Sequence, residues 1–433
     1  MNELAIDIPL RTEETKKSFW ITVLNFSSIM FGAGCLSLGV AFAKMGYVLG
    51  TGMVVTMGLL SIFSIILIDM LLFNSDQKDE STLSALARGR KRFALFIDLF
   101  IVLSSFLTTV YYYTLVIELI LFLFEFFCAP LLISNMFFYL SNFVITMAVL
   151  AILVKTSGKE PKWMTWVMVG SIGCVVLILI ILACFFHNQL RIGELVWIST
   201  ELDYWNAISA IIFAFSCQQS YIYRIKDLIY STERRRKQVI WASIGFGIVF
   251  YSLIGLLSYF IFGNISSDIL TELFKGYLHL PGYVSQSYKM LYLVSILALR
   301  IVFVIILTLA IGYQTAVGRE SFYILAPKIK LGQKTALWGY TLAQIMAFLL
   351  CGFLKLSPEN ALTLLGAITE PLLNFIVPFV SYLCFKSKNG FFTILSIIFC
   401  IFFVSLSGVS IHQFITGSNN NSTFELQCNT TVD

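Results

Sequence analysis

Charged residues are scarce in this chain. They make up 12% of the 433 positions, whereas hydrophobic residues make up 58% and the mean hydropathy is +0.87. Because a soluble domain is about half apolar and about a quarter charged, this composition excludes an ordinary soluble fold. A nucleic-acid-binding role is excluded as well, since it needs a basic face exposed to water. The composition is typical of a polytopic helical membrane protein.

Motifs for metal, redox and nucleophilic chemistry are also missing. The sequence has 3 histidines and 9 cysteines, but no CxxC, no HExxH and no Cys/His cluster. Most of the cysteines fall in apolar stretches, where a free cysteine behaves as a small hydrophobe. Cys128 and Cys428 are the two candidates for a disulfide on an oxidising face. We therefore expect neither a metal nor a cofactor, and no enzyme.

Eleven apolar stretches are long enough to cross a bilayer, which takes about 20 residues of helix. In chain order they are 19–43, 47–73, 93–126, 135–154, 163–187, 204–222, 238–262, 288–314, 335–354, 359–385 and 391–414. The first 18 residues are polar and mixed in charge, without the apolar core of a cleavable leader. We expect the first span itself to be the insertion signal.

The distribution of basic residues orients these spans. With the N-terminus in the cytoplasm, 23 of the 29 lysines and arginines fall in the N-terminal tail or in inner loops. The positive-inside rule favours this topology, which places the C-terminus outside or in a lumen. Acceptor sequons for N-glycosylation agree with it, because they lie on the outer side: Asn264 in a loop, and Asn420, Asn421 and Asn429 in the C-terminal tail. The membrane is expected to be the plasma membrane or a vacuolar or lysosomal membrane.

Two spans are interrupted near their middle. The first contains Gly32-Ala33-Gly34, and the short sixth span replaces aliphatic residues by aromatic and small polar ones between Phe213 and Gln219. Two hypotheses account for the glycines: a notch for close helix packing, or a break that exposes backbone groups to a ligand. Two interrupted spans, each opening a set of five, favour the second, as in transporters with inverted repeats.

This pattern divides the chain into an expected order of parts. They are a cytoplasmic tail (1–18), a first five-helix repeat (19–187), a second five-helix repeat (188–385), an extra helix (391–414) and an extracytoplasmic tail (415–433). The expected fold is an all-α polytopic membrane protein with a five-plus-five inverted repeat, discontinuous helices 1 and 6, and eleven transmembrane helices.

Four stretches resemble the amino acid/auxin permease family in the expected order. They are NFSSIMFGAGCLSLGVAFAKMG in the first span, FAFSCQQSYIYRIKDL in the sixth, the pair Arg300 and Arg319 in the eighth, and LLGAITEPLLNFIVPFVSYL in the tenth. The resemblance covers nearly the whole chain, from Ser18 to about Phe414. It implies a leucine-transporter-like fold and secondary transport of amino acids driven by sodium or protons.

The resemblance also implies where the substrate binds. Backbone groups of one segment would hold the main-chain groups of the amino acid: Gly32, Ala33, Gly34 and Cys35. A second segment would form the opposite wall: Phe213, Ala214, Phe215 and Ser216. Among Tyr111, Tyr112 and Tyr113 in the third span, we expect one ring, taken as Tyr112, to face the pocket and the other two to face lipid or the interface.

Two departures from the family pattern bear on the coupling ion. Sodium-coupled members often carry Asn at the position of Ser28 and a hydroxyl at the position of Ala310. Hard cations prefer oxygen ligands, so both departures weaken a sodium site, although Ser28 and Thr308 still offer oxygens. The sequence favours protons and leaves sodium open.

Ionisable side chains at bilayer depth mark function because their burial is costly. Arg300 lies well inside the eighth span and Glu370 well inside the tenth, followed by Pro371, which predicts a kink. We expect the two to be near each other, with Glu370 either titrating during transport or forming a fixed structural pair. Asp69 and Asp98 are expected at the interface, and the run Arg234 to Lys237 is expected to anchor the topology.

These features predict a secondary active transporter of small neutral amino acids that works by alternating access, with a small-molecule substrate, lipid around it and no nucleic acid. The alternative is a membrane nutrient sensor that binds an amino acid and signals through a partner. The short N-terminal tail and inner loops leave little surface for such a partner. An ion channel is disfavoured because no filter loop or acidic ring is present.

Overall fold

The computed structural model describes residues 17–32, 34–72, 83–87, 90–128, 144, 162–190, 195–199, 204–225, 228–262, 286–328, 331–354, 365–385 and 390–418. These residues are helical almost throughout. Over the described ranges the backbone forms no β-strand, and its one isolated bridge joins Lys17 to Leu228. The predicted all-α class is confirmed.

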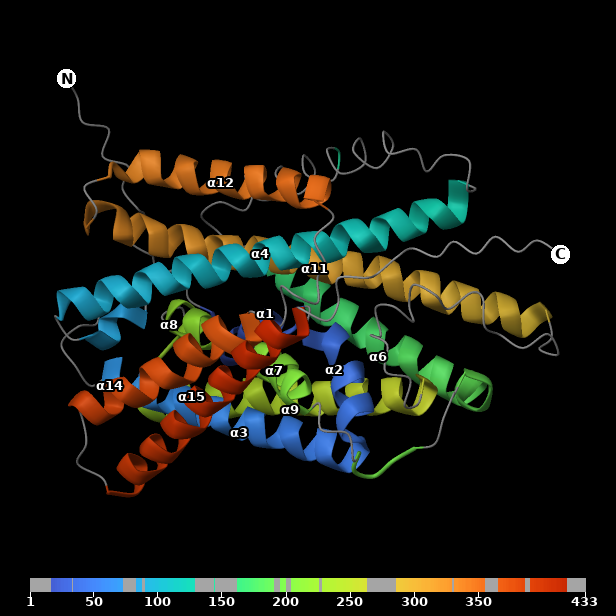
Figure 1. The fold of residues 1–433 in the computed structure, drawn as a ribbon, viewed down its shortest axis with the longest axis horizontal. Helices are drawn as coiled ribbons and strands as arrows, with labels where there is room; N and C mark the ends of the chain where they lie inside the picture. Colours follow the sequence, from blue (N-terminus) through green and yellow to red (C-terminus); the bar gives the residue numbers. More distant parts are fainter. Residues whose placement is uncertain are drawn as a thin grey trace.

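Six helices of the described part are long and apolar enough to cross a bilayer. They are α3 (Tyr47–Leu72), α4 (Lys91–Cys128), α6 (Lys162–Leu190), α9 (Glu233–Phe262), α11 (Gln286–Lys328) and α15 (Gly390–Ser418). The shorter α12 (Gln333–Leu354) packs along α4 and α11 (Figure 1). A 3₁₀ turn, η2 (Leu83–Ala87), precedes α4. The predicted fourth span, 135–154, lies outside the described residues apart from Val144.

The first and sixth spans are discontinuous, as predicted. The first consists of α1 (Phe19–Met30) and α2 (Gly34–Met45), whose axes are bent by 61°. The sixth consists of α7 (Tyr204–Ala214) and α8 (Gln218–Ile225). Both interruptions leave a few residues without helical hydrogen bonds at the centre of an apolar segment.

The tenth span is irregular around its acidic residue. Two π-helical turns, η4 (Leu365–Thr369) and η5 (Leu372–Ile376), flank Glu370 and Pro371, and α14 (Val377–Phe385) completes the span. Pro371 has no N–H to donate, and a widened turn is one way in which a helix absorbs this defect. Such turns are frequent at functional sites.

Two helices extend beyond their predicted bounds. α9 begins at Glu233 rather than at 238, and α11 continues to Lys328 rather than ending at 314. The extension of α9 consists of charged residues, which fall outside the hydropathy signal but are good helix formers. The extension of α11 follows the charged pair Arg319 and Glu320, which interrupts the apolar run. At the start of α9, an ion pair between Glu233 and Lys237 (2.6 Å) supports the added turn.

Helix packing follows the inverted repeat. Corresponding spans of the two halves contact each other: α2 packs on α7 and α1 on α8, α3 packs on α9, and α4 packs on α11. Figure 1 shows the long α4 and α11 running side by side, with the interrupted helices in the layer beneath them. This pairing is expected when two related halves enclose a common centre.

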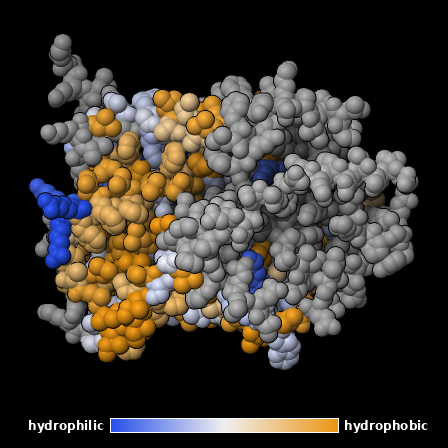
Figure 2. All heavy atoms as spheres, viewed as in Figure 1, coloured by the Kyte–Doolittle hydropathy of each residue, from blue (hydrophilic) through white to orange (hydrophobic). Residues whose placement is uncertain are grey.

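The outer surface is apolar where the structure describes it. Figure 2 shows hydrophobic side chains over most of the described part of one face, with a group of hydrophilic ones at the left edge and a few others further in. Large exposed side chains include Leu99, Trp166, Leu177, Ile301 and Ile401. Such a continuous apolar surface fits contact with lipid chains.

Candidate functional site

The first break is an inverse γ-turn centred on Phe31. This residue leaves the helical region with φ −78° and ψ 73°, and the Gly32 amide donates to the Met30 carbonyl at 2.9 Å. Any L-residue adopts these angles, and neither Gly32 nor Gly34 has a positive φ. The glycines therefore serve a need for space rather than for backbone freedom. Ala33 lies outside the described residues.

The two glycines face different neighbours. A Cβ at Gly32 would lie 2.4 Å from the hydroxyl oxygen of Tyr112 on α4. A Cβ at Gly34 would lie 2.6 Å from the Cα of Ala214, at the end of α7. Gly34 is thus a packing notch that lets the start of α2 touch the end of α7, whereas Gly32 makes room for the Tyr112 hydroxyl. Both contacts fit the packing hypothesis, and exposure of the backbone to a ligand stays a prediction.

The second break covers Phe215 to Cys217. The Phe215 amide is shared between the carbonyls of Ile211 (3.2 Å) and Ile212 (3.1 Å), which closes α7. The Cys217 amide donates to Oε1 of Gln218 (2.9 Å), so a side chain caps the start of α8. Phe213 and Ala214 still belong to α7, so this break begins two residues later than predicted.

Side chains of α3 support the second break. The Ser61 hydroxyl donates to the Phe215 carbonyl at 3.4 Å and accepts from Nε2 of Gln218 at 3.1 Å. Ser61, Phe215 and Gln218 are all fully buried. The unwound backbone is therefore satisfied by polar side chains, as it must be at bilayer depth.

Aromatic side chains line the contact between α4 and α7. The Phe213 ring meets the rings of Tyr111 (5.7 Å between centroids) and Tyr112 (6.2 Å), both edge-on. Tyr113 stacks on Phe348 of α12 at 4.3 Å. All three tyrosines are buried, so the prediction that two of them face lipid or the interface is wrong. Their helix is covered on more than one side by α7, α11 and α12.

A tyrosine that the sequence did not single out joins the two breaks. The hydroxyl of Tyr251, on α9, lies within hydrogen-bond distance of the Met30 carbonyl and of the Ala214 carbonyl, the latter at 2.8 Å. These carbonyls end α1 and α7. The Tyr251 ring stands edge-on to Phe31 (5.5 Å) and to Phe215 (5.1 Å), and the side chain is fully buried.

Glu370 lies beside the second break among neutral groups. Its Oε1 accepts from Ser104 of α4 at 2.8 Å, and its Oε2 accepts from Nδ2 of Asn374, one turn further along. Ser104 also accepts from Nε2 of Gln219 on α8 (3.4 Å), and Ser216 is a further hydrogen-bonding neighbour of the carboxylate. Among the described residues no cation pairs with Glu370.

The other predicted ion-coupling residues are not gathered with Glu370. Arg300 is buried on α11 but is not one of the partners of Glu370 in the described part of the chain. The Ser28 and Thr308 hydroxyls donate to carbonyls of their own helices, Asn25 (2.9 Å) and Val304 (2.7 Å). Cys35 is buried at the start of α2. The sequons at 264, 420, 421 and 429 lie outside the described residues, as does Cys428.

A buried ionic cluster lies at the C-terminal end of α3. Asp69 takes a two-pronged contact from Arg236 of α9 (Nε–Oδ1 2.7 Å, Nη2–Oδ2 3.3 Å), and the Tyr221 hydroxyl of α8 donates to it at 2.7 Å. Asp69 and Asp98 do not snorkel to the surface as expected, because both side chains are buried in the protein. Arg236 has a structural role beyond that of a topology anchor.

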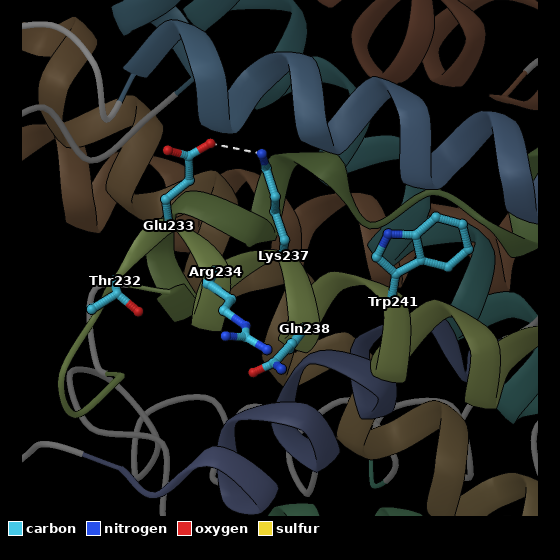
Figure 3. Close-up of a pocket in the computed structure, with 6 residues that line it drawn as sticks. All are labelled: Thr232, Glu233, Arg234, Lys237, Gln238 and Trp241. Atoms are coloured by element: carbon cyan, nitrogen blue, oxygen red, sulfur yellow. Dashed lines mark hydrogen bonds and ion pairs between the residues drawn. The ribbon is translucent and has the colours of Figure 1, made fainter.

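One pocket of the described structure lies away from the breaks. It has a volume of about 740 Å³ and is lined by side chains from the start of α9: Thr232, Glu233, Arg234, Lys237, Gln238 and Trp241 (Figure 3). Trp241 is ten residues before Tyr251, roughly 15 Å along the helix. The pocket therefore belongs to the charged end of α9 and not to the midplane site predicted from the sequence.

Two interrupted helices that meet near their breaks, inside a bundle that is helical throughout the described part of the chain, are characteristic of membrane transporters. The chain belongs to the family of transmembrane amino acid transporter proteins, whose family model matches residues 15–416. A comparison with curated protein sequences finds no match.

Solved transporter structures share this fold. The manganese transporter of Eremococcus coleocola, crystallised with an aromatic bis-isothiourea substituted compound, superposes with a TM-score of 0.61 at 14% identity, covering 94% of this chain and 88% of that one. A histidine-to-alanine mutant of that transporter gives 0.61 at 15% identity, covering 94% and 90%. At this level of identity the likeness concerns the fold alone.

Proposed function

We propose that this chain is a secondary active transporter that moves small neutral amino acids by alternating access around the two breaks, coupled to protons. The observation that carries the proposal is the direct contact of the breaks, Gly34 against Ala214, beneath the buried aromatic wall of Tyr112 and Phe213. Family membership supports the amino acid as substrate class.

The half-helix ends suit the two charges of an amino acid. α1 and α7 end at the centre, where the partial negative charge of their C-terminal ends attracts an ammonium group, although Tyr251 already occupies their last carbonyls, those of Met30 and Ala214. α2 and α8 start there, and their amide ends favour a carboxylate. A small side chain fits this arrangement best, because Tyr112 packs closely on Gly32 and Ala214 packs closely on Gly34. Cys35 and Ser216 complete the proposed site.

Glu370 is the proposed proton carrier. Its neutral partners Ser104 and Asn374 stabilise the carboxylate by hydrogen bonds, but no described cation balances its charge. A carboxylate at this depth favours uptake of a proton from the open side. Because Ser216 and Gln219 link the carboxylate to the second break, a change in its protonation reaches α8 directly.

The orientation proposed here has the N-terminus in the cytoplasm, on the basic side of the bundle. Substrate and proton would then enter from the outside or the lumen, close the outer halves, and leave after the inner halves open. Sodium is the alternative ion, with Ser28 and Thr308 as its oxygen donors.

The test is uptake by the full chain in reconstituted vesicles. A panel of labelled amino acids is compared under an imposed pH step and under an imposed sodium step. We expect concentrative uptake of small neutral amino acids with the pH step alone. Uptake only with the sodium step would replace the proton by sodium. Binding of an amino acid without uptake would favour the nutrient-sensor alternative, and transport of manganese in place of amino acids would overturn the substrate class.

A further inference from the structure

The carbonyl ends of α1 and α7 converge on one point. The Met30 and Ala214 carbonyls both lie within hydrogen-bond distance of a single oxygen, that of Tyr251. Each carbonyl is the last of a half-helix and carries part of the negative end of its dipole. Two such ends repel each other unless a positive group or a donor lies between them. In transporters with broken helices this place suits a cation or an ammonium group.

In this chain a neutral hydroxyl fills that place. A phenol has one proton, which it donates to one carbonyl or shares between two. Burial of the side chain is complete, so no bulk water competes for the two acceptors. Removal of the hydroxyl would leave the Ala214 carbonyl short of a donor at bilayer depth, where an unsatisfied group is costly. The Met30 carbonyl would keep only the Gly32 amide as its donor.

The surroundings fix the hydroxyl in this position. The Tyr251 ring is held between Phe31 and Phe215, each of which directly follows one of the two carbonyl residues. Gly247, four residues earlier and on the same face of α9, lets the helix approach: a Cβ there would lie 3.0 Å from Met30 Cε. Each break thus contributes a carbonyl and a ring to one side chain of a third helix.

We propose that Tyr251 is a positioning residue that holds the two breaks together in place of a bridging cation. The proposal rests on the proposed function, because it makes a side chain of α9 responsible for keeping the two breaks of the transport site in contact. It implies that the contact between the two breaks needs no metal ion between α1 and α7. It also implies that loss of the hydroxyl alone loosens both breaks at once.

The experiment measures how fast native cysteines beside the breaks react with N-ethylmaleimide in membranes that contain the full chain. Cys35 and Cys217 are both buried and free, and mass spectrometry identifies each product. We expect Tyr251→Phe, which keeps the ring, to raise the labelling rate of both by about ten-fold or more, from the loss of a buried hydrogen bond. Exchange of sodium for choline should leave wild-type labelling unchanged.

Tyr259→Phe is the matched control. Tyr259 lies on the same helix, is equally buried, and uses its hydroxyl to accept from the Val196 amide (2.9 Å) away from the breaks. Its variant should label within two-fold of wild type. Wild-type labelling in Tyr251→Phe, or equal increases in both variants, would overturn the proposal. So would protection of wild-type Cys35 and Cys217 by sodium, because a cation would then occupy the place assigned to the hydroxyl.

Two further measurements separate the possible failures. If Tyr251→Phe does not accumulate in the membrane, the wild type still decides: sodium-dependent protection of Cys35 and Cys217 would overturn the proposal, and labelling that is independent of sodium would support it. Uptake assays are run in parallel, and Tyr251→Phe is expected to lower the maximal rate about ten-fold. If the wild type transports no amino acid, the proposed function fails, while the labelling still decides the role of Tyr251.

Discussion

Gly32→Ala and Gly34→Ala each add one methyl group at the first break, and the structure predicts different outcomes. The added Cβ would lie 2.4 Å from the Tyr112 hydroxyl oxygen at position 32, and 2.6 Å from the Ala214 Cα at position 34. Ordinary van der Waals contact begins at 3.4 Å, so each variant requires a displacement of roughly 1 Å. The difference lies in which atom has to move.

Tyr112 can rotate its ring, whereas Ala214 can move only with the backbone of α7. Overpacking costs about 1–3 kcal/mol, and we place Gly32→Ala near the lower limit and Gly34→Ala near the upper. If that energy opposes the contact between the two breaks during transport, initial uptake rates fall about five-fold in Gly32→Ala and about 150-fold in Gly34→Ala. Midpoints of thermal unfolding in detergent should fall in the same order.

A double-mutant cycle with Tyr112→Phe tests the assignment. Loss of the hydroxyl removes the nearest atom facing position 32, so the Gly32→Ala, Tyr112→Phe double variant should recover part of the uptake rate of Gly32→Ala. The same substitution should give Gly34→Ala no recovery. Equal rescue of both glycine variants, or wild-type uptake by Gly34→Ala, would refute the view that Gly34 is the point of contact between the breaks.

Three other changes give distinct results. Glu370→Gln, which cannot carry a proton, should abolish concentrative uptake and flatten its rise toward low outside pH, as followed in vesicles over a pH series; retention of the full pH dependence would exclude Glu370 from coupling. Asp69→Asn leaves the buried Arg236 charge unbalanced and should destabilise the protein by about 3–5 kcal/mol, with partial recovery of the unfolding midpoint in the double variant with Arg236→Met. Gly46→Ala places a side chain at φ 81° and its Cβ 2.7 Å from the Val196 and Trp197 carbonyls; it should cost more than the about 1–2 kcal/mol of the backbone strain alone and lower the midpoint without changing the substrate preference.

Much of the architecture was predictable from local patterns. Long apolar runs set the spans, and the glycines at 32 and 34 located the first break because a small residue at mid-span weakens a helix. The interruption of the sixth span was visible as polar residues near Ser216. Helix ends were less predictable, since charged residues such as those at the start of α9 leave the hydropathy window but remain good helix formers.

The connections between helices were not predictable. Tyr251 looks like any aromatic residue in an apolar span, because its partners are backbone carbonyls far away in the sequence. Asp69 looks interfacial until α8 and α9 bring Tyr221 and Arg236 to it. A local signal existed for Asn374, which lies four residues after Glu370 and therefore on the same helix face.

The lengths of α4 and α11 have a consequence for measuring motion in this molecule. With 38 and 43 residues, they extend over roughly 57 and 65 Å, about twice the thickness of the hydrocarbon layer. Because these long helices pack on each other, we expect them to stay fixed while shorter segments shift. A spectroscopic probe on α4 or α11 would thus serve as a fixed reference, and distances from it to α1 or α8 would report which side of the membrane is open.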